Sequence, residues 1–357
     1  MTSLDITDMG SDVIVVTGGA GFIGSAVIRH LIREGGASVV NVDALTYAAN
    51  AASLAEVDAH PRYRFEHVDI RSAAEVERVF SAYRPTAVLH LAAETHVDRS
   101  IADPLVFVET NVLGTAILLQ TACRHWRSLP PAARTRFRFH HVSTDEVFGS
   151  LGPTGSFSEE AAYQPSSPYA ASKAGADHLV RAWHKTYGLP TIISNCSNNF
   201  GPYQCPEKFI PVMILSALKG QPMPIYGRGE NVRDWLFVDD HARALSMILR
   251  RGRIGDCYNV GAGNEMRNID VAGTICDLVD ELAQPLPGGK LRRELMTFVA
   301  DRPGHDARYA IDARKVREEL GWKPKETFES ALRRTVEWYL TNEAWTGPLR
   351  ASTVLSM

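Results

Sequence analysis

Residues 13–24 of the chain read VIVVTGGAGFIG. The first five form an apolar run typical of a buried strand, and a helical pattern follows the glycines and continues to about Arg33. Gly18, Gly21 and Gly24 lie in the turn between the two elements. Such a turn lets the backbone approach a pyrophosphate, whose charge the first amides of the helix can bind. The stretch therefore predicts a strand, a glycine turn and a helix that together bind a dinucleotide.

The rest of the N-terminal half continues this alternation. Strands alternating with helices are typical of a Rossmann-type, doubly wound parallel sheet, so we expect the α/β class. After about Pro190 prolines and glycines are frequent, which indicates a smaller mixed α/β C-terminal lobe. We expect a cofactor domain at 1–195, to which 230–255 returns, and a substrate lobe at 196–229 and 256–357. The further apolar strands are predicted at 38–42, 63–68, 87–92 and 136–142.

Composition excludes several classes of protein. With 357 residues, of which 45% are hydrophobic and 22% charged, the chain can bury a substantial core. A net charge of -3 without a basic stripe argues against a nucleic-acid partner. The five scattered cysteines suggest reduced thiols in a cytoplasmic protein, with neither a disulfide frame nor a metal site. No signal peptide is recognisable and no apolar run reaches transmembrane length, so no membrane association is expected.

Asp43 strengthens the dinucleotide prediction. It ends the second predicted strand, 19 residues after Gly24. A carboxylate about 20 residues after the glycines binds the adenosine ribose hydroxyls in dinucleotide-binding folds. The same carboxylate would repel a 2′-phosphate, so NAD is favoured over NADP.

Tyr169 and Lys173 are four residues apart and follow Ser167-Pro168, a typical helix start. Residues four apart lie on one face of a helix, so the phenol and the ammonium should be neighbours. A free tyrosine has a pKa of about 10 and is not a base at neutral pH. A nearby ammonium and a positively charged nicotinamide ring would both favour its phenolate form. Such pairs are also common on surface helices. Because this pair follows a predicted dinucleotide-binding segment in the sequence, however, it predicts a tyrosine base that works with the nicotinamide.

The stretch 143–146 reads STDE and follows the predicted strand at 136–142. Ligands of open parallel sheets bind outside the carboxyl ends of the strands. Neighbouring strand residues point to opposite faces, so Asp145 and Glu146 can share a site only if the chain turns there. Acids at a helix start also occur as simple caps. Beside a phenol–lysine pair, however, they indicate removal of a proton and a leaving group next to a newly formed carbonyl.

These segments resemble the dTDP-glucose 4,6-dehydratases, a branch of the extended short-chain dehydrogenase/reductase family. The resemblance covers about residues 12–340, and the Thr-Asp-Glu triplet separates this branch from related sugar-nucleotide epimerases. Phe148 and Phe200 stand where the family usually has tyrosine, which puts a hydrogen bond near the site in doubt. The matching segments are 18–24, 43–47, 90–98, 143–147, 169–173, 195–199, 233–235, 268–270 and 301–306.

The resemblance implies an NAD-dependent hydro-lyase that converts dTDP-glucose to dTDP-4-keto-6-deoxyglucose and water. C4 is oxidised, water is eliminated across C5 and C6, and hydride returns to C6 from the bound cofactor. Tyr169 would take the C4 hydroxyl proton, Lys173 would hold the nicotinamide ribose and Thr144 would bond the C4 oxygen. Glu146 would remove the C5 proton and Asp145 would protonate the leaving hydroxyl. Asp145 must then be protonated, so we expect burial and the neighbouring carboxylate to raise its pKa.

The resemblance also implies contacts to both ligands. Guanidinium groups bind phosphate oxygens bidentately, which makes Arg233 and Arg302 candidates for the pyrophosphate. Around NAD the expected residues are Gly18, Gly21, Phe22, Ile23, Gly24, Asp43, Leu45, Thr46, Asp69, Ile70, Leu91, Ala92, Ala93, Thr110, Tyr169, Lys173 and Asn199. Around the substrate they are Thr95, Thr144, Asn198, Lys208, Phe209, Pro224, Ile225, Tyr226, Arg233, Asn268, Asp301, Arg302 and His305.

Two other functions fit the same fold. A sugar-nucleotide 4-epimerase or decarboxylase would not need the acid pair, because an epimerase never eliminates water. A non-catalytic NAD-binding sensor or scaffold would have no use for a proton donor. Both thymidine and uridine stay open as the nucleobase, and the downstream deoxysugar pathway is not encoded in these motifs. The resemblance further implies a homodimer that pairs through helices, here the helix after Asp103 and the one that holds Tyr169.

Overall fold

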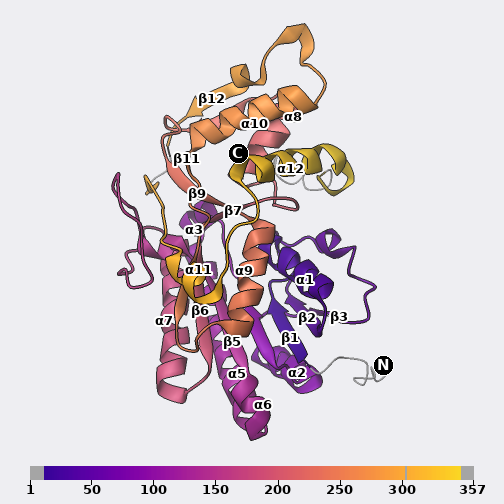
Figure 1. Cartoon of the computed structure of the whole chain (residues 1–357), viewed down its shortest axis with the longest axis vertical. Helices are drawn as coiled ribbons and strands as arrows, with labels where there is room; N and C mark the ends of the chain where they lie inside the picture. Colours follow the sequence, from indigo (N-terminus) through magenta and orange to yellow (C-terminus); the bar gives the residue numbers. More distant parts are fainter. Residues whose placement is uncertain (1–11, 302–303, 347–357) are drawn as a thin grey trace.

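The computed structural model describes residues 12–301 and 304–346, which form two packed parts (Figure 1). The larger part is a seven-stranded parallel sheet with the strand order β10-β6-β5-β4-β1-β2-β3. This order and the flanking helices confirm the predicted doubly wound α/β fold. The strands are β1 (Asp12–Thr17), β2 (Ala37–Asp43), β3 (Tyr63–His67), β4 (Ala87–His90), β5 (Arg138–Thr144), β6 (Thr191–Cys196) and β10 (Cys257–Val260).

Alternation along β1 shows how both faces of the sheet are buried. Val13 and Val15 pack with one layer of helices, whereas Ile14 and Val16 pack with the opposite layer, because successive strand residues point to opposite faces. A continuous apolar run is therefore what a central parallel strand requires. The first layer is α2 (Ala73–Tyr83), α5 (Thr115–Ser128) and α7 (Pro168–Tyr187), and the second is α1 (Phe22–Glu34) and α9 (Val238–Arg251).

The helical stretch Pro104–Ser128 joins α4 (Pro104–Phe107), the π-helical segment η3 (Val108–Gly114) and α5. An 18-residue window within it has a mean hydropathy of 1.4, and by length and composition the stretch could cross a membrane, so the expectation that no run reaches this length was wrong. In the fold 44% of this apolar window is buried, and the stretch packs against α2 and α7. A core helix of a soluble protein passes the same test, which makes this weak support for a membrane span.

The smaller part has its own hydrophobic core. Figure 1 shows it, mostly in orange and yellow, at one end of the large sheet. Two short sheets, ordered β11-β9-β7 and β12-β8, pack there against three helices. The strands are β7 (Asn198–Phe200), β8 (Met223–Tyr226), β9 (Val232–Phe237), β11 (Glu265–Arg267) and β12 (Met296–Val299); the helices are α8 (Phe209–Lys219), α10 (Asn268–Leu282) and α12 (Phe328–Thr341).

One segment assigned to the second lobe from the sequence lies in the large sheet instead. β10 pairs in parallel with β6, and its Tyr258 and Val260 are fully buried. The predicted boundary at 255/256 therefore falls one strand too early, because these apolar side chains complete the core beneath α9. The remaining elements are α3 (Val97–Ala102), α6 (Pro131–Arg136), α11 (Arg314–Leu320) and the short helical turns η2 (Ala51–Leu54), η4 (Asp145–Phe148), η5 (Pro287–Gly289) and η6 (Arg292–Leu295).

Candidate functional site

A cavity of about 330 Å³ lies at the carboxyl ends of β1, β2, β4, β5 and β6. This is the edge at which open parallel sheets bind ligands. The predicted catalytic residues Thr144, Asp145, Glu146, Tyr169 and Lys173 all line it. So do the other predicted cofactor residues except Leu45, namely Gly18, Gly21, Phe22, Ile23, Gly24, Asp43, Thr46, Asp69, Ile70, Leu91, Ala92, Ala93, Thr110 and Asn199.

The glycine turn shows why a dinucleotide fits at the start of α1. At Gly18, where φ is +71°, a Cβ atom would lie 2.7 Å from the Ala92 backbone, and at Gly24 it would lie 2.1 Å from the Gly18 carbonyl oxygen. Both glycines are thus required by packing. At Gly21 a Cβ atom would meet only the Gly18 carbonyl oxygen, at 3.2 Å. Gly21 keeps the first turn of α1 accessible to an anion, as a pyrophosphate would require.

Asp43 is held at the end of β2 by two backbone amides. Its Oδ2 accepts a hydrogen bond from the Ala20 amide and its Oδ1 accepts one from the Leu45 amide, both at 2.8 Å. Burial raises the pKa of Asp43, while these two bonds act in the opposite direction. Leu45 contributes its amide rather than its side chain, which is exposed. The carboxyl thus faces the cavity from a rigid position.

The end of β5 turns as the acid pair requires. Thr144 precedes the helical turn η4 and its Oγ1 accepts a hydrogen bond from the Glu146 amide at 3.3 Å. The same hydroxyl donates to Asp145 Oδ1 at 3.4 Å. The Asn195 side chain donates to the Thr144 carbonyl at 3.0 Å, which ties the turn to β6. This turn is why two adjacent acids can both line one cavity.

The two acids differ in their surroundings. Asp145 is 1% exposed, whereas Glu146 is only half-buried. Burial, followed by the charges of Glu146 and Asp234, raises the pKa of Asp145 well above its usual value. The expected causes, burial and the neighbouring carboxylate, are confirmed, and Asp234 is a third that was not foreseen. A carboxyl whose pKa is raised in this way keeps its proton to higher pH, as a general acid requires.

Tyr169 and Lys173 begin α7, whose first turn is capped by Ser167 as predicted. The Ser167 hydroxyl accepts a hydrogen bond from the Ala170 amide at 3.1 Å. Lys173 Nζ donates to the Val142 carbonyl at 2.9 Å. Burial, followed by the charge of Glu146, raises the pKa of Tyr169 well above its usual value. The chain alone therefore does not produce the predicted lowering of this phenol pKa, and the contribution of a positively charged nicotinamide stays a prediction.

The predicted substrate residues fall into two groups. Thr95, Asn198 and Lys208 line the cavity, and Lys208 Nζ donates to the Thr95 carbonyl at 3.2 Å. Arg302 lies outside the described residues. The others lie outside the cavity lining: Phe209, Pro224, Ile225, Tyr226, Arg233, Asn268, Asp301 and His305.

Part of this second group forms a cluster in the smaller lobe. His305 Nδ1 lies 2.6 Å from Asp301 Oδ1, and the His305 ring meets the Tyr226 ring edge-on at 6.1 Å. Arg233 is buried, donates to the Asp306 carbonyl and lies over the Tyr309 ring at 4.4 Å. Its predicted contact with the pyrophosphate stays a prediction.

The two phenylalanines that replace tyrosine lie outside the cavity lining. Phe148 stacks on Phe157, with ring centroids 5.2 Å apart, and meets Tyr163 edge-on. Phe200 is fully buried in the core of the smaller lobe against Trp235. Both positions are apolar aromatic clusters, in which a phenol hydroxyl would need a partner.

Sequence reasoning missed several polar groups that surround the cavity. Asp234 lies near Asp145, and Tyr309 lies near Glu146. His141 and Asp177 lie directly behind Lys173. The only local signal for Asp177 is its position four residues after Lys173, which places both on one face of α7.

The chain matches the family model described as GDP-mannose 4,6 dehydratase over residues 15–335. A dTDP-glucose 4,6-dehydratase of Neisseria meningitidis is 61% identical over 334 residues, covering 93% of this chain and 94% of the relative. The structure of a dTDP-glucose 4,6-dehydratase from Streptomyces venezuelae with NAD and TYD bound has a TM-score of 0.86 at 45% identity, covering 94% and 99% of the two chains. A UDP-glucose 4-epimerase of Thermotoga maritima has a TM-score of 0.80 at 28% identity, covering 92% and 98%. The chain therefore belongs to the dTDP-glucose 4,6-dehydratases of the extended short-chain dehydrogenase/reductase family.

Proposed function

We propose that the chain converts dTDP-glucose to dTDP-4-keto-6-deoxyglucose and water, as an NAD-dependent hydro-lyase. One observation carries the proposal: a buried Asp145, whose pKa is raised, lies beside Glu146 in the cavity that Tyr169 and Lys173 also line. A sugar-nucleotide epimerase shares the fold and needs no such acid. The names of the relatives at more than half identity support the substrate.

Each group of the cavity has a role in this scheme. NAD, held by the glycine turn and Asp43, would supply the hydride acceptor for C4 of the sugar and the hydride donor for C6. Tyr169 takes the C4 hydroxyl proton, and Lys173 holds the nicotinamide ribose. Glu146, which is half-buried, removes the C5 proton. Asp145 gives its proton to the leaving C6 hydroxyl, and Thr144 hydrogen-bonds the C4 oxygen. General acid–base help of this kind contributes roughly 10²–10⁴-fold for each group.

The test is the mass of the product after incubation with dTDP-glucose and, in parallel, with UDP-glucose. Loss of one water from dTDP-glucose supports the proposal. A faster loss of water from UDP-glucose would show that the preferred substrate carries uridine and not thymidine. An isobaric sugar product would instead indicate an epimerase. An unchanged sugar nucleotide, with NAD bound to the protein, would indicate a binding protein without this activity.

The finer assignments are a homodimer and a cytoplasmic location. Ile101, Leu105 and Val108 are 47%, 69% and 49% exposed on consecutive turns of α3, α4 and η3, which pack beside α7. Such an apolar face fits a second copy of the chain. A dimeric mass by light scattering that becomes monomeric in Leu105→Glu supports this pairing, and an unchanged dimer in the variant would contradict it. The five cysteines are free thiols, as a reducing compartment allows.

A further inference from the structure

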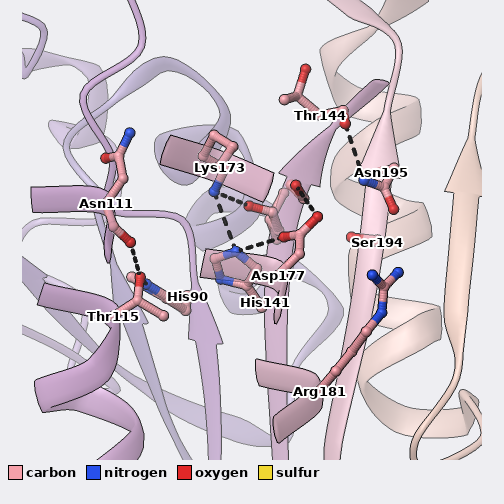
Figure 2. A network of polar contacts seen from close by, with 12 residues as sticks. His90, Asn111, Thr115, His141, Thr144, Lys173, Asp177, Arg181, Ser194 and Asn195 are labelled. Carbon is pink, nitrogen blue, oxygen red and sulfur yellow. Dashed lines mark hydrogen bonds and ion pairs between the residues drawn. The ribbon is translucent and has the colours of Figure 1, made fainter. Parts of the chain in front are cut away.

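A network of buried polar side chains lies directly behind Lys173 (Figure 2). Asp177 lies one helical turn after Lys173 on α7, and its side chain is 0% exposed. Asp177 Oδ1 lies 3.2 Å from His141 Nε2, and this nitrogen lies 3.4 Å from Lys173 Nζ. Figure 2 shows the three side chains facing one another between β5 and α7. Both contacts are made by the same imidazole nitrogen, so the lysine, the histidine and the aspartate form one compact cluster at the back of the cavity.

The second carboxylate oxygen of Asp177 has two hydrogen-bond donors. Asp177 Oδ2 accepts hydrogen bonds from the Ser143 hydroxyl at 2.8 Å and from the Tyr163 hydroxyl at 2.9 Å. Arg181 in turn donates to the Tyr163 hydroxyl at 2.9 Å. A carboxylate that accepts several hydrogen bonds is held in its ionised form. The position is therefore built for a negative charge, although it lies in the core.

Charge balance explains why a buried carboxylate is tolerated there. Burial lowers the pKa of Lys173, and the charge of Asp177 opposes this shift. Burial and the Lys173 charge lower the pKa of His141 to about 4, so the imidazole is neutral near pH 7. For Asp177 burial acts upward, but the bond from His141 and the charge of Lys173 outweigh it and lower the pKa. One ammonium and one carboxylate thus compensate each other, whereas either alone would be strongly unfavourable.

The other titratable groups nearby leave this balance intact. Burial raises the pKa of Cys196 and of Cys257 to about 12 and lowers that of His90 well below its usual value, so all three are neutral near pH 7. Burial and the charge of Asp177 also raise the pKa of Tyr163. Arg181 is the further charged group that acts on the Asp177 carboxylate.

We propose that Asp177 is a positioning residue for the reaction: with His141 packed between them, it supplies the buried counter-charge that keeps Lys173 protonated and oriented at the nicotinamide end of the cavity. The inference rests on the proposed roles of Lys173 and Tyr169. Without that counter-charge Lys173 loses its proton more readily, and a neutral amine no longer stabilises the phenolate form of Tyr169. Tyr169 then acts as a base only at higher pH.

The test compares Asp177→Asn with Tyr163→Phe, which removes one hydrogen bond to the same carboxylate but leaves its charge. Turnover of dTDP-glucose is measured across pH. For Asp177→Asn we expect the acid limb of the kcat profile to move up by about one pH unit, a roughly tenfold loss of kcat on that limb, and a KM changed by less than about twofold. Tyr163→Phe should leave the limb in place. An unmoved limb in Asp177→Asn would overturn the proposal.

A second measurement does not depend on turnover, so it can be made even if the Asp177→Asn variant is too unstable for kinetics. The urea midpoint is measured for Asp177→Asn alone and in the Lys173→Met background. We expect Asp177→Asn to lower the urea midpoint in the Lys173→Met background by about half as much as in the parent, or less. In that background no buried ammonium is left without its counter-charge. Equal losses in both backgrounds would contradict the pairing. A reduced loss, together with no activity of the parent protein on any sugar nucleotide, would reject the proposed function and leave the charge pair standing.

Discussion

Two fully buried aspartates lie on opposite sides of β5, and their surroundings shift their pKa values in opposite directions. Burial acts to raise the pKa of both. At Asp145, on the cavity side, the neighbouring carboxylates add to that effect and the pKa is raised well above its usual value. At Asp177, behind the cavity wall, His141 and Lys173 reverse it and the pKa is lowered. Neighbours rather than burial thus decide whether a buried carboxyl is an acid or a counter-charge.

The strand itself separates the two regions. Ser143 and Thr144 are adjacent on β5, and their side chains point to opposite sides, as neighbours on a strand do. The Ser143 hydroxyl donates to Asp177 Oδ2 at 2.8 Å, and the Thr144 hydroxyl donates to Asp145 Oδ1 at 3.4 Å. Two adjacent residues of β5 therefore contact the two aspartates: Ser143 contacts Asp177, the counter-charge of Lys173, and Thr144 contacts Asp145, the proposed acid.

The largest expected effect concerns the chemistry of Asp145. Asp145→Asn keeps the shape of the side chain but removes its proton donor, so water elimination should slow by roughly 10²–10⁴-fold. Oxidation at C4 depends on Tyr169 and should continue, which would be seen as absorbance of the reduced cofactor. Rapid-quench mass analysis of the sugar nucleotide measures both steps. Water loss at the parent rate would reject Asp145 as the acid.

The second effect is on stability, and there the order of the two aspartates reverses. Asp177→Asn leaves a buried ammonium without its counter-charge, which should cost about 3–5 kcal/mol in the free energy of unfolding. Asp145→Asn replaces a neutral acid by a neutral amide and should cost less than about 1 kcal/mol. Urea unfolding of both variants gives the comparison. Equal losses would mean that the two carboxyls carry the same charge.

The pH dependence of stability sharpens the contrast, because the two shifts have opposite signs. The folded pKa of Asp145 is raised, so its contribution is full below the unfolded value of about 3.9 and is lost as pH rises through the folded pKa. The folded pKa of Asp177 is lowered, so its contribution is full above about 3.9 and is lost as pH falls.

Urea midpoints measured from acid to neutral pH test these signs. Relative to the parent, Asp145→Asn should gain stability as pH rises, whereas the deficit of Asp177→Asn should shrink as the pH falls below about 4. Parallel curves for the parent and both variants would contradict the assigned shifts.

The smallest effects should come from the two hydroxyls of β5. Ser143→Ala removes a short bond to a charged group and should cost about 1.5–3 kcal/mol of stability with little change in the kcat profile. Thr144→Val removes a longer bond and the cap of η4, for about 0.5–1 kcal/mol. Thr144→Val should lower kcat more than Ser143→Ala does, because Thr144 is the hydroxyl proposed to hydrogen-bond the C4 oxygen, whereas the Ser143 hydroxyl donates to Asp177. If Ser143→Ala lowered kcat more than Thr144→Val, the reaction would have to take place on the Ser143 side of β5, which would contradict the proposed site.

Local patterns were sufficient for most of the cavity side. The apolar run before Gly18 and the turn at residues 143–146 have direct signatures, because a buried parallel strand and a turn after it each require particular residue types. The region behind the cavity has no such signature. An aspartate on a helix looks like a solvated residue until the fold brings His141 of β5 against it, and Asp177 was therefore missed. β10 was misplaced for a similar reason, since only pairing with β6 identifies a four-residue strand.

The most direct test of the opposite charges is infrared spectroscopy of the carboxyl groups near pH 7, with the parent protein compared with Asp145→Asn and Asp177→Asn. The account predicts that the carbonyl band of a protonated carboxyl is present in the parent, disappears in Asp145→Asn and persists in Asp177→Asn. A band that persists in Asp145→Asn and disappears in Asp177→Asn would show that the acid and the counter-charge had been assigned to the wrong residues.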